Sequence, residues 1–460
     1  MFNIYLTTLG CPKNQVDSER LKKGLLSEGF IFAESPEEAD IFLVNTCGFI
    51  RDAKEESIDE ILSQAKKKTE LLSGSKDWGF KKLLVMGCLA KRYKDELLKE
   101  IPEIDALWGV GEDEQIIEYC KGLRNSSHFM ENHKKNDTVP QSSAPSFAYL
   151  KIAEGCDKKC TFCVIPSIRG KFQSISSESI LKEAEGFISQ GVKELILVAQ
   201  DITNYGKDLK RYNLVSLLND ITAIDGDFWV RLLYLYPTSI SDELLESIAE
   251  NEKICRYLDI PLQHSEDRIL RLMGRRGTKK EYIKLLRNIR RRIPDIALRT
   301  TFITGFPSET EEEFRCMMDF IEEMRFDRLG VFKYSKEEGT PAEKIKGQIP
   351  EKTKNRRYHE IMKRQAAISL EKNEEMRCRR FRAKIDEFDG SVAIARLYCH
   401  APEIDGVVII NDAGYCKESK IGICPGDFVD IEITGAYDYD LMGRIIHEDC
   451  GIQKNVRADI

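Results

Sequence analysis

The chain contains two blocks in which strand-like and helix-like segments alternate. In the first block, three apolar runs end at Cys11, Cys47 and Cys88, and amphipathic stretches lie between them. The second block has six such runs between residues 147 and 335, again separated by helical stretches. Because strands joined through helices form parallel sheets, this alternation predicts two α/β units.

The remainder of the chain predicts a third unit. Six strand–helix units make an open, partial (βα)6 version of the (βα)8 barrel, with its chemistry at the carboxyl ends of the strands. After about Cys378, short apolar segments broken by Gly, Pro and Asp predict a small antiparallel β-barrel of about five strands. The expected fold class is α/β with this barrel at the C-terminal end. We expect an N-terminal parallel-sheet domain, a linker, the partial barrel, the β-barrel and a tail over residues 1–124, 125–146, 147–377, 378–446 and 447–460.

Composition and the first residues predict a cytoplasmic protein. Of the 460 residues, 42% are hydrophobic and 32% charged, and no apolar run is long enough to span a membrane. The first residues read as a strand rather than a signal peptide. In a reducing compartment, fourteen cysteines are explained better by metal ligation than by disulfides. The net charge of −7 argues against binding nucleic acid by bulk electrostatics.

Three cysteines at C-x-x-x-C-x-x-C spacing, Cys156, Cys160 and Cys163, lie on one short loop. Three thiolates on one loop can hold three corners of a 4Fe-4S cluster and leave the fourth iron open to a small molecule. A zinc loop is the alternative. Zinc sites usually close with four ligands, and no His follows at ligand spacing, so we favour the cluster.

Cys11, Cys47 and Cys88 each follow a predicted strand, with a glycine beside them. Since the carboxyl ends of parallel strands share one edge of the sheet, the three thiols are expected to converge. A single cysteine in such a place is most often a structural thiol. Three at equivalent positions favour a second metal site with one ligand from each strand–helix unit.

Polar residues near the ends of the six later strands are further candidates, although some of them only satisfy loop backbone groups. These residues are Gln200, Asp201, Arg231, Tyr236, Gln263, His264, Arg299, Thr304, Gly305, Tyr334 and Ser335. For His264 a hydrogen-bonded structural role is favoured over that of a general base. The run Arg287, Arg290, Arg291 and Arg292 indicates a solvated helix face or a docking patch for an acidic partner or RNA.

The C-terminal segment is acidic. Between Arg379 and Arg444 it has 8 Lys and Arg against 12 Asp and Glu, a net charge of 8 − 12 = −4. Such a barrel suits a basic protein better than a phosphate backbone. Four cysteines in this part fit no familiar ligand spacing and are interpreted as structural: Cys399, Cys416, Cys424 and Cys450.

The loop EGCDKKCTFC, with Phe162 before its last cysteine, resembles the signature of the radical S-adenosylmethionine (SAM) enzymes, and the C-terminal segment resembles a TRAM domain. With the three dispersed cysteines, nearly the whole chain resembles the methylthiotransferase family. The segments TLGCPKNQVDSE, LRTTFITGFPSET, YSKEEGTPAE and APEIDGVV are similar to the branch that modifies an aspartate of the decoding-centre protein of the small ribosomal subunit. The branch that modifies an adenosine of tRNA typically opens with GCQMN.

This resemblance implies two 4Fe-4S clusters. The loop cysteines would hold the radical SAM cluster, whose open iron binds SAM, and Cys11, Cys47 and Cys88 would hold an auxiliary cluster. The implied SAM-binding residues are Phe162, Gln200, Arg299, Thr304 and Gly305. One SAM would provide the radical that removes a hydrogen atom from the β-carbon of the aspartate, and a second SAM the methyl group.

The implied partners are a basic ribosomal protein and an electron donor such as flavodoxin or ferredoxin. A tRNA adenosine methylthiotransferase and a non-catalytic zinc-binding ribosome-associated scaffold remain the alternatives. The chain departs from the family pattern at Ser308, where Gly is common, and at Ile175, where Arg is frequent. Which residue supplies that basic contact stays open, with Lys171 and Arg169 as the candidates.

Overall fold

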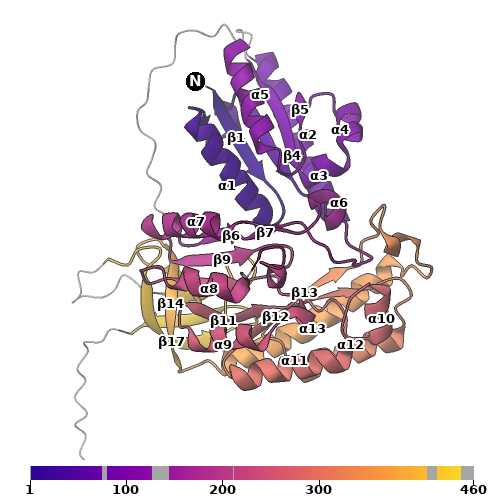
Figure 1. Cartoon of the computed structure of the whole chain (residues 1–460), viewed down its shortest axis with the longest axis vertical. Coiled ribbons are helices and arrows are strands. Elements are labelled where there is room, and N and C mark those ends of the chain that lie inside the picture. The colour runs from indigo at the N-terminus through magenta and orange to yellow at the C-terminus, as the bar shows by residue number, and fades with distance from the viewer. Residues whose placement is uncertain (1, 75–79, 127–144, 211, 412–421, 447–460) are drawn as a thin grey trace, which may run out of the picture.

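The computed structural model describes residues 2–74, 80–126, 145–210, 212–411 and 422–446, which form three packed units (Figure 1). The predicted linker over 125–146 falls mostly, and the predicted tail over 447–460 wholly, outside the described residues. In the described ranges, no helix has both the length and the apolar character needed to cross a membrane.

The first unit is a parallel sheet with strand order β2-β1-β3-β4-β5. Its strands are β1 (Asn3–Thr8), β2 (Ile31–Phe32), β3 (Ile41–Thr46), β4 (Lys82–Gly87) and β5 (Ala106–Leu107). Its helices are α1 (Pro12–Ser27), η1 (Pro36–Glu38), α2 (Arg51–Gly74), α3 (Cys88–Arg92), α4 (Lys94–Glu100) and α5 (Asp113–Ser126). All six residues of β3 are buried because this strand is central and covered on both faces.

The second unit is a six-stranded parallel sheet with order β13-β12-β11-β10-β9-β6. Its strands are β6 (Ala148–Lys151), β9 (Glu194–Val198), β10 (Trp229–Leu232), β11 (Ile254–Asp259), β12 (Ala297–Thr304) and β13 (Arg328–Lys333), and a small β7 (Ala153–Glu154) and β8 (Gln173–Ser174) pair lies beside it. Its helices are α6 (Ile165–Arg169), α7 (Ser177–Ser189), η2 (Ile202–Asn204), α8 (Leu214–Thr222), η3 (Pro237–Ser239), α9 (Asp242–Glu250), α10 (Asp267–Leu272), α11 (Lys279–Arg292), α12 (Glu311–Met324), η4 (Pro341–Lys344) and α13 (Glu351–Glu374). This unit is the expected partial barrel.

Local sequence signals set the starts of several of these helices. The side chains of Ser176, Ser241, Thr278 and Thr310 each accept a hydrogen bond from the first turn of α7, α9, α11 and α12. At α12 the Glu313 side chain reciprocates and completes a capping box. Such caps stabilise a helix by about 1 kcal/mol each and fix where it begins.

The third unit is a closed five-stranded barrel with order β14-β15-β16-β18-β17. Its strands are β14 (Arg380–Phe388), β15 (Ala393–Leu397), β16 (Val408–Ile410), β17 (Phe428–Ala436) and β18 (Leu441–Ile445). The predicted antiparallel barrel is confirmed except at one pairing, because β16 and β18 run parallel.

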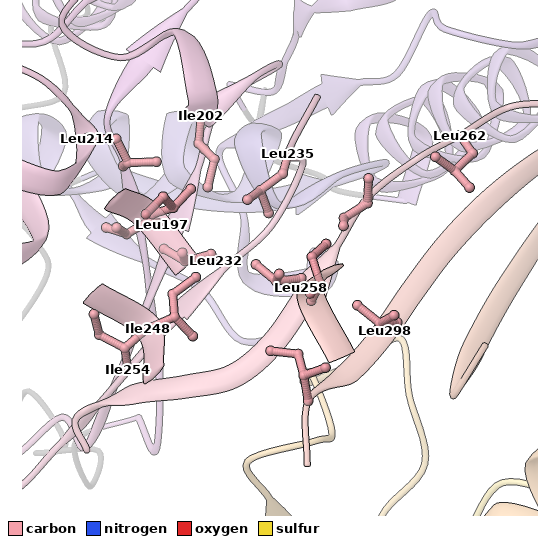
Figure 2. Packing of buried hydrophobic residues seen from close by; sticks show 14 of the residues in the cluster. Leu197, Ile202, Leu214, Leu232, Leu235, Ile248, Ile254, Leu258, Leu262 and Leu298 are labelled. Atoms are coloured by element: carbon pink, nitrogen blue, oxygen red, sulfur yellow. The ribbon is translucent and has the colours of Figure 1, made fainter. Parts of the chain in front are cut away.

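The six-stranded sheet is buried on both faces. Alternate residues such as Leu197, Leu232 and Leu258 pack against the surrounding helices, as Figure 2 shows. The intervening residues, including Trp229 and Tyr257, pack instead against the C-terminal barrel. Each such side chain contributes about 1.5–3 kcal/mol on burial, so the barrel is part of the core rather than an appended module.

The N-terminal domain lies across the carboxyl ends of this sheet and contacts both of its edges. On one side α1 packs against β6, and Asp17 forms an ion pair with Lys151, the last residue of that strand. On the other side, the Arg51 N–H donates to Ser335 Oγ at 3.2 Å, just beyond β13. The carboxyl edge of the first sheet therefore faces the carboxyl ends of the second.

Candidate functional site

The loop that carries Cys156, Cys160 and Cys163 follows the short strand β7 and is fastened at several points. Its Cys156 N–H donates to Gly170 O at 3.1 Å, and the Thr161 N–H donates to Met273 O at 2.9 Å. The Thr161 hydroxyl also donates to Leu272 O at 2.7 Å. This anchoring at the end of α10 holds the three thiols in one fixed turn.

The three thiols lie close enough to influence one another electrostatically. Burial raises the pKa of Cys163 to about 12, and the neighbouring Cys160 and Cys156 act in the same direction. Burial likewise raises the pKa of Cys156. Arg275 Nη1 lies 4.0 Å from Cys160 Sγ and brings a positive charge to the loop. The deprotonated thiolate forms of these cysteines are consequently favoured only when cations or a metal centre neutralise their charge.

Cys11, Cys47 and Cys88 directly follow or lie close behind β1, β3 and β4, which are neighbours in the sheet. A Cβ atom on Gly10 would lie only 2.7 Å from Cys47 Cβ, so the glycine permits a close approach between the first two loops. Burial raises the pKa of Cys47 to about 11 and also raises that of Cys88, and Cys11 adds to both shifts. These three cysteines thus form a second group of coupled thiols at the edge that faces the other sheet.

A buried polar network lies between the two groups of thiols. Arg169 donates to Asn14 Oδ1 at 2.6 Å, to Asp17 Oδ2 at 3.1 Å and to both carboxylate oxygens of Glu154 at 3.0 Å. Gln200 joins through Nε2, which donates to Glu154 Oε1 at 2.9 Å. The network therefore connects the N-terminal helix α1 with β7 and with the carboxyl end of β9.

Several polar atoms at the strand ends have no hydrogen-bond partner among the described residues, although they are buried. They include Gln200 Oε1, Thr304 Oγ1 and Tyr334 OH. Buried polar atoms are rarely left unpaired, so these atoms indicate a place for a polar ligand. Nearby, the Gly305 N–H donates to the Glu309 carboxylate, and Phe162 packs edge-on against Phe306.

Arg231 and Arg299 are both held by carboxylates, and Arg299 lies well before the end of its strand. Arg231 is the third residue of β10, is fully buried and pairs with Glu194 toward the C-terminal barrel. Arg299 is the third of eight residues in β12 and pairs with Asp259 at 2.9 Å and Asp405 at 3.6 Å. Arg231 thus lies near the end of its strand, as predicted, but its side chain is bound by Glu194. Arg299 is held by two carboxylates of its own.

The remaining strand-end residues have local roles. Asp201 caps η2 and lies 3.3 Å from Lys158 Nζ, and the Tyr236 ring is flanked by Lys158 and Arg275. Gln263 adopts a positive φ of 74° beside β12.

His264 is fully buried and accepts a hydrogen bond at Nδ1 from the Glu266 N–H, which supports the structural role.

The basic run on α11 is largely occupied by local partners. Arg287 and Arg292 form ion pairs with acidic residues, and Arg290 donates to the carbonyls of Met324 and Arg325.

Among the C-terminal cysteines, Cys399 is buried and Cys424 is exposed, while Cys416 and Cys450 lie outside the described residues.

Sequence reasoning missed Asn14, Asp17 and Glu154 as parts of the site. Asn14 and Asp17 follow Cys11 by three and six residues on α1, so both face the same side of the helix start. Helical spacing from a candidate ligand was the available signal. In the described ranges, no group of three His, Cys, Asp or Glu side chains has the spacing of a single-ion site.

Three family profiles together match most of the chain. Residues 150–321 match the Radical SAM superfamily, residues 3–109 match the Uncharacterized protein family UPF0004, and residues 379–446 match the TRAM domain. Their order agrees with the three units of the fold.

A protein of Thermodesulfovibrio yellowstonii, named ribosomal protein uS12 methylthiotransferase RimO, is 57% identical over 446 residues. The alignment covers 97% of this chain and 100% of that protein. The chain belongs to the RimO methylthiotransferase family. A RimO protein of Acetivibrio thermocellus is 44% identical, with 96% of this chain and 98% of that protein covered.

Among solved structures, the radical SAM methyltransferase TsrM of Kitasatospora setae superposes with a TM-score of 0.53. It shares 14% sequence identity and covers 74% of this chain and 76% of its own, so this likeness shows the fold alone. As a RimO-family member with a radical SAM domain, the chain is a radical SAM methylthiotransferase that uses SAM and a 4Fe-4S cluster.

Proposed function

We propose that this chain transfers a methylthio group to the β-carbon of an aspartate in ribosomal protein uS12, the decoding-centre protein of the small subunit. The observation that carries the proposal is the 57% identity to a protein named for uS12 methylthio transfer, over nearly the full length of both chains. The chain's two groups of cysteines, on facing edges of two sheets, support the same reaction.

The radical site would be built by Cys156, Cys160 and Cys163, with one iron left open for SAM. Their place on one anchored loop suits this role. The unpartnered oxygens of Gln200 and Thr304 are suited to bind polar groups of SAM. Phe162 and Gly305 would complete the SAM site at the same strand ends, whereas Arg299 would contribute through its ion pairs.

The auxiliary site would be built by Cys11, Cys47 and Cys88. Three cysteines behind three adjacent strands, brought close by Gly10, fit a cubane with one iron free to present sulfur. When bound, the two clusters and SAM would supply three things: the radical that takes the hydrogen atom, the sulfur, and the methyl group, which comes from a second SAM. The chain's own part is to hold the target aspartate between the two facing edges and to exclude water there.

The partners follow from the same proposal. An acidic C-terminal barrel suits a basic ribosomal protein better than tRNA. The electron needed to cleave SAM would come from a donor such as flavodoxin or ferredoxin, in the cytoplasm. We also propose the domain boundaries. The N-terminal domain covers 1–124, the linker 125–146, the radical SAM domain 147–377, the TRAM domain 378–446 and the tail 447–460.

An anaerobic assay tests the substrate. Reconstituted protein, SAM, reductant and sulfide would be offered a peptide from the aspartate loop of uS12 and, separately, tRNA that lacks the modification. We expect mass spectrometry to find an added methylthio group on the peptide aspartate alone. Modification of tRNA alone would contradict the proposal and favour the tRNA branch. A Cys88→Ala variant, which lacks one auxiliary ligand, should leave the peptide unmodified.

A further inference from the structure

A single short helix connects the two groups of cysteines. Helix α6 begins two residues after Cys163 and ends at Arg169. Val164 and Ile168 pack in one small apolar cluster with Cys88 of the N-terminal domain. The radical SAM loop therefore continues, within six residues, into a direct contact with the second group of thiols.

Arg169, at the end of this helix, makes that contact through its guanidinium group. Its side chain is 1% exposed, and Nη2 lies 3.6 Å from Cys88 Sγ and within hydrogen-bond distance of it. The same Nη2 donates to Asn14 Oδ1, which lies 3.8 Å from Cys88 Sγ. Arg169 is thus a buried cation whose hydrogen-bond donor faces the sulfur of a proposed cluster ligand.

The surrounding charges form a network of four ion pairs. Arg169 pairs with Asp17 and Glu154, and Lys151 pairs with the same two carboxylates. Two cations therefore face two anions, and Arg169 is the member of this group that also reaches sulfur. Because Arg169, Asp17 and Lys151 are largely buried, a change of charge at any of them should alter the electrostatic potential at Cys88 strongly.

We propose that Arg169 is a positioning residue that holds the Cys88 sulfur and sets the reduction potential of the auxiliary cluster. A hydrogen bond and a positive charge at a ligand sulfur stabilise the reduced, more negative form of a cluster, and hence raise its potential. This inference rests on the auxiliary cluster of the proposed function.

The test uses the full chain with Cys156, Cys160 and Cys163 replaced by Ala, so that the auxiliary cluster alone gives a signal. In this background, the midpoint potential is measured by an EPR-monitored redox titration. Arg169→Gln is expected to shift the potential to a more negative value, and Arg169→Lys by less, because lysine keeps the charge. Asp17→Asn is expected to shift it to a more positive value, since it removes an anion that faces Arg169.

A matched control lies elsewhere in the same domain. Asp105 is a partly buried carboxylate paired with Lys68 and Lys82, next to the amino end of β4 and away from the cysteines. Asp105→Asn should leave the potential unchanged.

The outcomes separate the inference from the proposed function. If Arg169→Gln leaves the potential unchanged, or if Arg169→Gln and Asp17→Asn shift it in the same direction, the inference is overturned while the function stands. If the background chain takes up no 4Fe-4S cluster, the proposed auxiliary site fails and the inference fails with it. Should Arg169→Gln not fold, the other two variants test the inference. Opposite shifts in Arg169→Lys and Asp17→Asn would support it, and shifts in the same direction would overturn it.

Discussion

Arg396 of the C-terminal barrel donates to both carboxylate oxygens of Glu194, the first residue of β9, at 2.6 and 3.2 Å. Arg231 Nε donates to the same carboxylate at 2.7 Å, and Lys384 Nζ lies 3.2 Å away. Burial opposes the charged form of Glu194, yet the attraction of the three cations outweighs it and holds the pKa of this carboxyl well below its usual range. One carboxylate thus joins the catalytic sheet to the barrel.

Removing this carboxylate should destabilise the protein strongly. Glu194→Gln leaves three buried cations without their shared anion, and we expect a loss of about 3–5 kcal/mol in the free energy of unfolding. Urea unfolding measures it. The control is Glu432→Gln, which breaks a more exposed pair with Arg444 and should cost less than about 1 kcal/mol. Equal effects of the two substitutions would contradict this account of the interface.

His400 should make the stability depend on pH. It is fully buried, neither ring nitrogen has a hydrogen-bond partner among the described residues, and burial lowers its pKa well below the usual value, with nearby arginines adding to the shift. Below about pH 6.5 the unfolded chain binds a proton that the folded chain does not. The contribution of neutral His400 to the free energy of unfolding is therefore fully present above that pH. It falls as the pH drops, by about 1.4 kcal/mol per pH unit.

The measurement is urea unfolding at a series of pH values between 5 and 8. His400→Leu should remove this part of the slope, while His359→Gln, at an exposed site on α13, should keep it. A slope that is unchanged in His400→Leu would show that His400 is not the group responsible.

Gly155 should be essential for the loop that holds Cys156. It has φ 75°, and a Cβ atom there would lie 2.1 Å from Lys171 O, a backbone atom that cannot move aside easily. Gly170 has nearly the same φ, 74°, but its Cβ would meet nothing within 4 Å. We expect Gly155→Ala to lose roughly half of the reconstituted iron, since one of the two proposed clusters would be lost. Gly170→Ala should retain the iron but cost about 1–3 kcal/mol, because φ 74° with ψ −162° is a conformation that essentially only glycine adopts. Retention of all iron in Gly155→Ala would refute the prediction.

Glu337 should hold the first two units together through its ion pairs. Its side chain is 2% exposed and pairs with Lys54 at 2.8 Å and with Arg92 at 2.9 Å, and Arg92 also donates to Gly48 O beside Cys47. Glu337→Gln should speed amide hydrogen exchange at Arg51, whose N–H donates to Ser335. The neighbouring Glu338 is exposed, so Glu338→Gln should exchange as the parent protein does. Identical exchange rates in the two variants would disprove this role of Glu337.

The sequence predicted the features that depend on local periodicity. Alternating apolar and amphipathic segments indicated both parallel sheets, and Cys11, Cys47 and Cys88 were correctly placed just after strands of the first sheet. The two-residue strands β2 and β5 were missed because so short an edge strand leaves no pattern. The parallel pairing of β16 with β18 was missed because it joins segments far apart in the chain.

The site residues show the same division. The pairing of Arg231 with Glu194 was not predicted because it forms on the face of the sheet that the barrel covers, and nothing in β10 itself reports that packing. The contacts of Asn14 and Asp17 with Arg169 were missed because they form only when the two α/β units dock, and Glu154 was missed because the loop and α6 must fold back to bring Arg169 to it.

In the proposed reaction, a hydrogen atom leaves the β-carbon of an aspartate in uS12. A uS12 loop peptide with deuterium on that carbon tests this step when the mass of the released 5′-deoxyadenosine is followed. We expect deuterium to appear in 5′-deoxyadenosine together with methylthio addition to the peptide. Addition of the methylthio group without deuterium in 5′-deoxyadenosine would contradict it.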